Sequence, residues 1–257
     1  MEERFLRKTG LVVNSKIDVI SKLLCEKKII SWASESLSKR IYLVNVHSVV
    51  SAKFDRQFSK IINNADIALP DGAPIAYMLK ILGLDQKERI SGPDLMSSLI
   101  PKCEKYNLSV YFYGSTFETL RLMENRIKEN HPNLRFAFES PPFRQMTSEE
   151  MELIIKKINS FEPNIVFVGL GCPKQEKWIA SKHGKINSVM IGVGAAFNFY
   201  AGNLKRAPFL LRNNGLEWLH RLFQEPKRLF PRYLKTNAIF IFYAGLQIFK
   251  KMINSNS

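Results

Sequence analysis

The sequence is poor in the residues that build disulfide frameworks and zinc sites. It has three cysteines, Cys25, Cys103 and Cys172, which are widely spaced and form no Cys-x-x-Cys pair. Neither a disulfide-stapled scaffold nor a structural zinc site is therefore predicted, and a reducing cytoplasm is the expected compartment. The opening residues, MEERFLRKTG, are charged and lack the apolar core of a secretion signal.

Several catalytic signatures are absent as well. The chain contains no Asp-x-Asp pair, which would hold a divalent ion against a nucleotide-sugar diphosphate, and no His-Glu-x-x-His or Gly-x-Ser-x-Gly motif. No metal and no cofactor is therefore predicted. If a diphosphate binds, arginine side chains and backbone N–H groups must neutralise its charge in place of a metal.

Long hydrophobic runs are also missing. The longest apolar stretch, residues 238–249 (AIFIFYAGLQIF), has 12 residues, whereas a membrane-spanning helix needs roughly 20. This stretch is predicted either to lie in a membrane interface or to pack against the body of the protein.

Acidic residues are scarce relative to basic ones. The 257 residues include 38 Lys and Arg against 23 Asp and Glu, for a formal net charge of +15. A surplus of this size indicates an anionic partner, which can be nucleic acid, a phosphorylated ligand or an acidic membrane. Ten basic and two acidic residues follow Gly202, a balance of +8, and they alternate with aromatic residues and leucines. This pattern suits a surface helix on anionic lipid; a packed helix with a solvated basic face is the alternative.

Short β-rich runs alternate with helical patterns along most of the chain. The runs predicted as strands are residues 41–46, 67–69, 109–113, 134–138, 165–168 and 189–191. Thr147, followed by two glutamates within the next three residues, predicts the start of a helix. The alternation predicts an α/β fold with a mostly parallel, Rossmann-like sheet flanked by helices. The composition changes near Gly202, which predicts an α/β catalytic domain (1–202) and a basic helical C-terminal appendage (203–257).

Polar residues follow the first two predicted strands, and ligands of an open parallel sheet bind beyond the carboxyl ends of its strands. The amide of Asn45 can hydrogen-bond a base or a sugar, or it can cap a helix. Nearby His47 is either a general base or a structural histidine. Asp71, followed by Gly72, can take a proton from an attacking hydroxyl. Asp-Gly is equally a common turn pair that needs no function.

Arg89 precedes a Ser-Gly-Pro-Asp turn that contains Gly92 and opens a helix. The unpaired N–H groups at a helix start suit anions, and the guanidinium fork matches the geometry of phosphate. In the alternative interpretation, Ser91 or Asp94 only caps the helix and Arg89 is a surface charge.

The richest stretch is VGLGCPKQEKW, residues 168–178. Gly171 lets the backbone approach a ligand, and Gln175, followed by Glu176, can donate and accept hydrogen bonds to a sugar or base. The stretch lacks the third glycine of a dinucleotide fingerprint and the Gly-Lys-Ser/Thr of a Walker loop. Gly194 belongs to a second glycine pair that ends the next strand, so both stretches are predicted to face the same crevice.

Six motifs, PDGAP, RISGPDL, YFYGS, VGLGCPKQEKWI, GVGAAFNFYAGNLKRAP and GLEWLHRLFQEPKR, occur in the order seen in the WecG/TagA/CpsF glycosyltransferases. The resemblance to this family covers about residues 5–235. It implies an α/β domain with a membrane-binding appendage, and inverting, metal-independent sugar transfer in envelope or extracellular polysaccharide synthesis. The implied partners are a UDP-sugar donor, of N-acetylmannosamine or glucose type, and a polyprenyl-diphosphate-linked saccharide acceptor.

The same resemblance implies a location at the bacterial inner membrane. The chain is expected to attach peripherally to the cytoplasmic face, where the inner leaflet is anionic. A homo-oligomer is left open.

Residue by residue, Asp71 resembles the proposed general base of the family, and Arg89 and Gln175 resemble its active-site polar residues. The full set of predicted substrate-binding residues is Asn45, Gly72, Arg89, Gly92, Gly171, Gln175, Glu176 and Gly194. The arginines predicted to contact the membrane or the diphosphate are Arg212, Arg221, Arg228 and Arg232.

Two other functions are compatible with part of the sequence. A nucleic-acid-binding protein would explain the charge, but the basic surplus lies beside a lipophilic tail and no recognised nucleic-acid motif appears. No nucleic-acid partner is therefore predicted. A non-catalytic scaffold of a polysaccharide-assembly complex would keep the fold, but the presence of Asp71, Arg89 and Gln175 argues against it.

Overall fold

The structure is a computed structural model that describes residues 7–86 and 88–255. The prediction that the chain has no secretion signal rests partly on the first six residues, which lie outside the described ranges. Contacts divide the chain into two compact units. Unit 1 comprises Met1–Lys22, Leu43–Ser91 and Arg206–Ser257, and unit 2 comprises Leu23–Tyr42 and Gly92–Lys205. The predicted division into a catalytic domain and an appendage at residue 202 stays a prediction.

The predicted α/β class is confirmed by a six-stranded parallel sheet in the order β4-β3-β8-β7-β5-β6. Its strands are β3 (Lys39–Val44), β4 (Ile67–Pro70), β5 (Val110–Gly114), β6 (Phe136–Glu139), β7 (Ile165–Gly169) and β8 (Val189–Gly192). Each of the six predicted runs overlaps one of these strands. β4, β5 and β8 are buried along their whole length. Such continuous apolar runs are typical of parallel strands that are covered on both faces.

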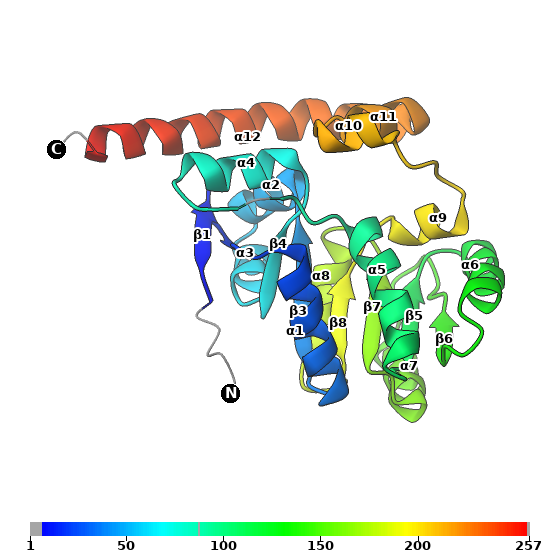
Figure 1. The fold of residues 1–257 in the computed structure, drawn as a ribbon. Helices are drawn as coiled ribbons and strands as arrows, with labels where there is room; N and C mark the ends of the chain where they lie inside the picture. Colours follow the sequence, from blue (N-terminus) through cyan, green and yellow to red (C-terminus); the bar gives the residue numbers. More distant parts are fainter. Residues whose placement is uncertain (1–6, 87, 256–257) are drawn as a thin grey trace. The chain divides into compact units, whose positions relative to one another are not determined.

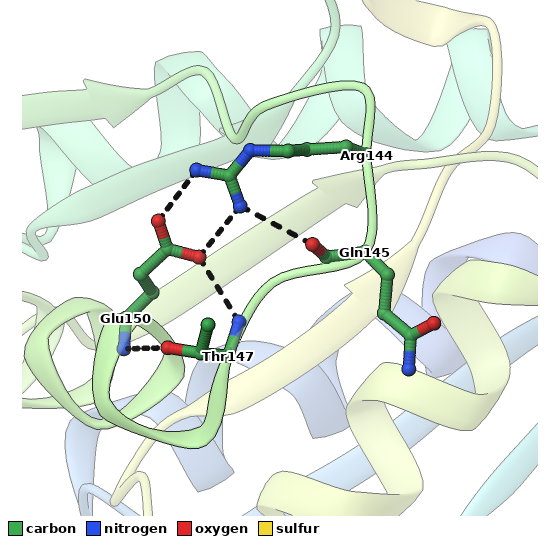
Figure 2. A network of polar contacts seen from close by, with 4 residues as sticks. All are labelled: Arg144, Gln145, Thr147 and Glu150. Carbon is green, nitrogen blue, oxygen red and sulfur yellow. Dashed lines mark hydrogen bonds and ion pairs between the residues drawn. The ribbon is translucent and has the colours of Figure 1, made fainter.

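Helices cover the part of the sheet that belongs to unit 2 (Figure 1). They are α1 (Lys22–Ser34), α5 (Gly92–Lys105), α6 (Phe117–Asn130), α7 (Ser148–Phe161), α8 (Lys174–Lys182) and α9 (Ala196–Ala201). The start of α7 agrees with the prediction from Thr147. The Thr147 hydroxyl accepts the Glu150 N–H, and the Glu150 carboxylate accepts the Thr147 N–H and two bonds from Arg144 (Figure 2).

Unit 1 contains a hairpin that the sequence did not reveal. β1 (Thr9–Val12) and β2 (Ser15–Asp18) pair antiparallel, and Val13 between them adopts a positive φ of 59°. Two four-residue strands are too short to show a clear alternation of apolar and polar residues. The helices of unit 1 are α2 (Val46–Phe54), α3 (Arg56–Asn63), α4 (Ala73–Ile81), α10 (Phe209–Asn213), α11 (Glu217–Gln224) and α12 (Pro226–Ser255).

The apolar stretch 238–249 lies inside α12, which packs along α2 (Figure 1). The buried residues of α12, Leu229, Thr236, Phe240 and Ala244, recur at helical spacing and form one stripe. Near its end the helix is attached to β1, because the Gln247 side chain accepts the Val13 N–H and donates to the Leu11 carbonyl. No helix among the described residues is long and apolar enough to cross a membrane.

The last three helices expose large apolar side chains outside that buried stripe. Between 37 and 77% of each of the following side chains is exposed: Phe209, Leu210, Leu216, Trp218, Phe223, Phe230, Leu234, Ile241, Phe242, Leu246, Phe249, Met252 and Ile253. Apolar side chains in this number on one segment are unusual for a surface that faces only water.

Candidate functional site

A cluster of ionisable side chains in unit 1 surrounds Asp71, which directly follows β4. The N–H of Asp71 donates to the Val44 carbonyl at the end of β3, which holds the residue beside the neighbouring strand. Asn45, the next residue after β3, donates its amide to Asp71 Oδ2 at 3.4 Å. The oxygen of the same amide caps α2 by accepting the Ser48 N–H. Asn45 is therefore both a helix cap and a direct partner of Asp71.

Arg89 belongs to the same cluster and is not a surface charge. Its side chain is 18% exposed and forms an ion pair with Glu217 of α11 at 2.7 Å. Arg206 pairs with the other oxygen of Glu217 at 3.2 Å. The same nitrogen of Arg89 also donates to the Arg212 carbonyl at 3.5 Å. Arg89 is thereby held at the helices that follow residue 206.

These charges set the proton affinity of Asp71. The side chain is half-buried, and the loss of water around it raises the pKa of Asp71 above its ordinary value. The charge of Arg89, the amide of Asn45 and the charge of Arg221 oppose the rise, whereas Glu217 adds to it. A carboxylate with a raised pKa is a better proton acceptor, and nearby arginines can hold an anion.

The other predicted tail arginines have different surroundings. Arg228 forms two bonds to Glu225, at 2.6 and 2.8 Å, and Arg221 contacts the same carboxylate at 3.5 Å. Arg232 lies on α12 in a groove beside α2. The two acidic residues of the tail are therefore both engaged by arginines, Glu217 near Asp71 and Glu225 at the start of α12.

A second cluster lies in unit 2, where β7 and β8 end. Gln175 is buried, and its side-chain oxygen accepts the N–H groups of Gly171 at 3.2 Å and Gly194 at 3.0 Å. Both glycines have positive φ, 79° and 58°, which glycine adopts without strain. Gln175 therefore joins the two glycine turns, and the structure brings these three predicted residues together.

The buried carboxyl group of Glu176 binds the side-chain amide of Gln175. It is 0% exposed, and its Oε1 accepts the Gln175 amide at 2.9 Å. No partner is found for its buried Oε2. Burial raises the pKa of Glu176 to about 7, although the hydrogen bonds from Gln175, its own backbone and Cys172 act in the opposite direction. The predicted substrate contacts of Gln175 and Glu176 stay predictions.

The remaining predicted glycines begin helices. Gly72 has a positive φ of 89° and caps α4, and Gly92 is the buried first residue of α5. Glu217, whose carboxylate pairs with both Arg89 and Arg206, was not among the predicted site residues. The available signal in the sequence was that Glu217 is one of only two acidic residues among the ten basic ones that follow Gly202. Within the described ranges, no group of three or more His, Cys, Asp and Glu side chains could hold a metal ion.

Comparison with known proteins identifies the family to which this chain belongs. The glycosyl transferase WecG/TagA/CpsF family matches residues 11–254. The chain is 30% identical over 198 residues to the N-acetylglucosaminyldiphosphoundecaprenol N-acetyl-beta-D-mannosaminyltransferase of Bacillus subtilis (strain 168), covering 77% of this chain and 76% of that protein. It is also 30% identical over 203 residues to a protein of the same name from Staphylococcus aureus (strain MW2), covering 79% and 78%.

The chain therefore belongs to the WecG/TagA/CpsF family, and the family predicted from the six motifs is confirmed. The predicted enzyme class, a glycosyltransferase, is confirmed with it.

Proposed function

We propose that this glycosyltransferase moves an N-acetylmannosamine-type sugar from UDP to an N-acetylglucosaminyl-diphosphate-polyprenol acceptor. The names of the two bacterial relatives support this choice of sugars and of lipid-linked acceptor. The observation that carries the proposal is the half-buried Asp71, whose pKa is raised and which lies among arginines.

In the proposed reaction Asp71 is the general base. A hydroxyl oxygen of the acceptor attacks the anomeric carbon of the donor sugar, and its proton passes to the Asp71 carboxylate. The bond between that carbon and the UDP oxygen breaks, and UDP leaves with the electron pair, so the configuration at carbon inverts. A positioned base contributes about 10²–10⁴-fold to such a step.

Arg89 and Arg221 are proposed to hold diphosphate near Asp71. Arg89 is already paired with Glu217, so an incoming diphosphate competes with a carboxylate for the guanidinium. This arrangement keeps Arg89 oriented before substrate arrives and limits its affinity for other anions. The planar guanidinium of arginine can bind a phosphate through two N–H groups at once, which the single ammonium of lysine cannot, so lysine is not an equivalent residue there.

Gln175 and Glu176 are proposed to act on the nucleotide-sugar side as positioning residues. The side chain of Gln175 fixes the backbone of Gly171 and Gly194, and Glu176 fixes the amide of Gln175. The backbone of the two glycine turns, rather than the buried side chains, would then contact the donor.

The exposed apolar and basic side chains of α10, α11 and α12 are proposed to bind the cytoplasmic face of the inner membrane. Apolar residues on this segment would enter the interface, while the exposed Lys227 and Lys250 would face anionic head groups. Peripheral attachment would bring the enzyme to an acceptor that is itself held in the bilayer.

The test is turnover with a panel of UDP-sugars and an N-acetylglucosaminyl-diphosphate-lipid acceptor, followed as acceptor-dependent release of UDP. We expect UDP-N-acetylmannosamine to be the best donor. Asp71→Asn should lower turnover by at least about a hundredfold while binding of UDP persists. Asp85→Asn, a change of an exposed carboxylate of unit 1 that is not in the cluster, is the matched control.

Full turnover of Asp71→Asn would remove the proposed base. Loss of UDP affinity in this variant would place Asp71 in the donor site instead. Absence of UDP release with every donor would contradict the proposed function and favour a scaffold.

A further inference from the structure

A groove runs between α2 and α12 in unit 1. It has a volume of about 540 Å³ and is lined by His47, Val50, Ser51 and Phe54 of α2 and by Arg232, Lys235, Thr236 and Ile239 of α12. The lining positions on each helix are three, four and seven residues apart, so each set lies on one helical face. The groove is therefore built by the regular packing of the two helices.

One end of the groove lies next to the Asp71 cluster. Asn45, which donates to Asp71, caps the first turn of α2, and His47 belongs to that turn. Tyr233, beside Arg232, is close enough to both Arg232 and Asp71 for their charges to act on its hydroxyl. The cationic wall of the groove thus begins where diphosphate is proposed to bind.

The other end is apolar and leads away from that cluster. Phe54 is the last residue of α2 and is 65% exposed, although its ring makes an edge contact with Tyr243. Val50 and Ile239 supply the apolar lining between the two ends. His47 and Phe54 are seven positions apart on α2, so the groove is about 10 Å long at 1.5 Å per residue.

We propose that this groove holds the first isoprenyl units of the acceptor, those next to its diphosphate. The proposal rests on the proposed function, because it assigns the groove to the lipid of that acceptor. Charge complementarity supports the direction of binding: the diphosphate lies at the end with Arg232 and Lys235, and the hydrocarbon follows the apolar lining toward Phe54. The groove would guide the chain from the active site toward the exposed apolar side chains of α12.

Filling the groove tests the proposal. Ser51 is half-buried in its wall, and Ser51→Trp places an indole where the isoprenyl chain would lie. Ile239→Trp fills it independently from the opposite helix. Gln57→Trp, an exposed position of α3 outside the lining, is the matched control. The readout is the ratio of kcat/KM for two N-acetylglucosaminyl diphosphate acceptors, one ending in a farnesyl group and the other in a methyl group.

We expect wild type and Gln57→Trp to prefer the farnesyl acceptor by at least about tenfold. A factor of ten corresponds to about 1.4 kcal/mol, the contribution of roughly two buried methylene groups. Both groove variants should reduce the ratio toward one. An unchanged ratio in both folded groove variants, or no preference in wild type, would overturn the proposal.

Direct binding separates a failure of this inference from a failure of the proposed function. If no protein releases UDP with either acceptor, the proposed function is wrong, and the groove is then tested with farnesyl diphosphate and inorganic diphosphate by calorimetry. Tighter binding of farnesyl diphosphate to wild type, lost in Ser51→Trp, would support an isoprenyl site. Equal affinity of wild type for the two probes would overturn it.

Discussion

The buried carboxyl group of Glu176 should make the stability of the protein fall as the pH rises. Its pKa is raised from 4.5 to about 7 by burial. A group whose folded-state pKa is raised contributes stability that is fully present below the unfolded pKa and is lost as the pH rises through the folded pKa. For Glu176 the loss begins near pH 4.5 and is nearly complete above pH 8.

The size of the effect follows from the shift in pKa. Each pKa unit corresponds to about 1.36 kcal/mol, so the shift corresponds to about 3 kcal/mol between the two limits of pH. Glu176→Gln removes the ionisation and keeps an oxygen that can accept the Gln175 amide. Its new NH₂ group lies near the position of Oε2, for which no partner is found, and adds a cost of about 1–3 kcal/mol at every pH. The pH dependence, and not the absolute stability, is therefore the informative quantity.

Thermal unfolding followed by circular dichroism between pH 5 and pH 8.5 measures this dependence. Relative to wild type, Glu176→Gln should gain about 5–10 °C in Tm across that interval, given about 2–4 °C per kcal/mol for a chain of this size. Glu129→Gln, at an exposed position of α6, is the control and should follow wild type. A constant difference in Tm between Glu176→Gln and wild type at all pH values would show that Glu176 is not a buried acid of raised pKa.

Three further outcomes follow from the cluster around Asp71 and from the tail. Arg89 lowers the pKa of Asp71 and Glu217 raises it. Arg89→Met should therefore move the acid limb of the pH profile of kcat/KM to higher pH, and Glu217→Gln should move it to lower pH. Shifts of the same sign would disprove Asp71 as the group that titrates. Turnover should persist in EDTA, since the cations proposed to hold diphosphate are arginines; loss of activity that Mg²⁺ or Mn²⁺ restores would contradict this. Changing Arg221, Arg228 and Arg232 together to Glu should abolish binding to anionic vesicles in co-sedimentation. Changing the exposed Lys60, Lys128 and Lys156 together to Glu is the control and should have less effect. Unchanged binding of the tail variant would assign the tail a packing role only.

The parallel strands could be predicted because each is a short, nearly uninterrupted apolar run. β5 and β7 are examples, since almost every residue in them is buried. The β1–β2 hairpin could not be predicted in the same way, because each strand has only four residues and its partners lie far away in the sequence. Asp18 is an example: it accepts from Arg7 and from the Ala68 N–H, which lies 50 residues away in the chain.

The candidate site was predicted as a set of residues but not as a set of contacts. Asp71, Asn45 and Arg89 each follow a strand or precede a helix, so their position, together with the family resemblance, marked them as candidates. Their partners could not be found from position, because Arg89 pairs with Glu217 across 128 residues. The partners of Gln175 could not be found from position either. An amide that can bond a sugar can equally bond two backbone N–H groups, and only the fold shows which it does.

Unit 1 is assembled from three separate stretches of the chain, and this imposes an order on biosynthesis. All of unit 2 lies between residues 23 and 205, so it leaves the ribosome before α11 and α12 do. Three features of unit 1 have their partners in this late segment: α2 packs against α12, the Leu11 carbonyl accepts from Gln247, and Arg89 pairs with Glu217. Domains generally fold as units during synthesis. Glu217 and Arg221, whose charges act on the pKa of Asp71, therefore reach their positions late. They do so together with the helices that carry the exposed apolar side chains. The electrostatic environment of Asp71 and the exposed apolar surface thus form in the same late step.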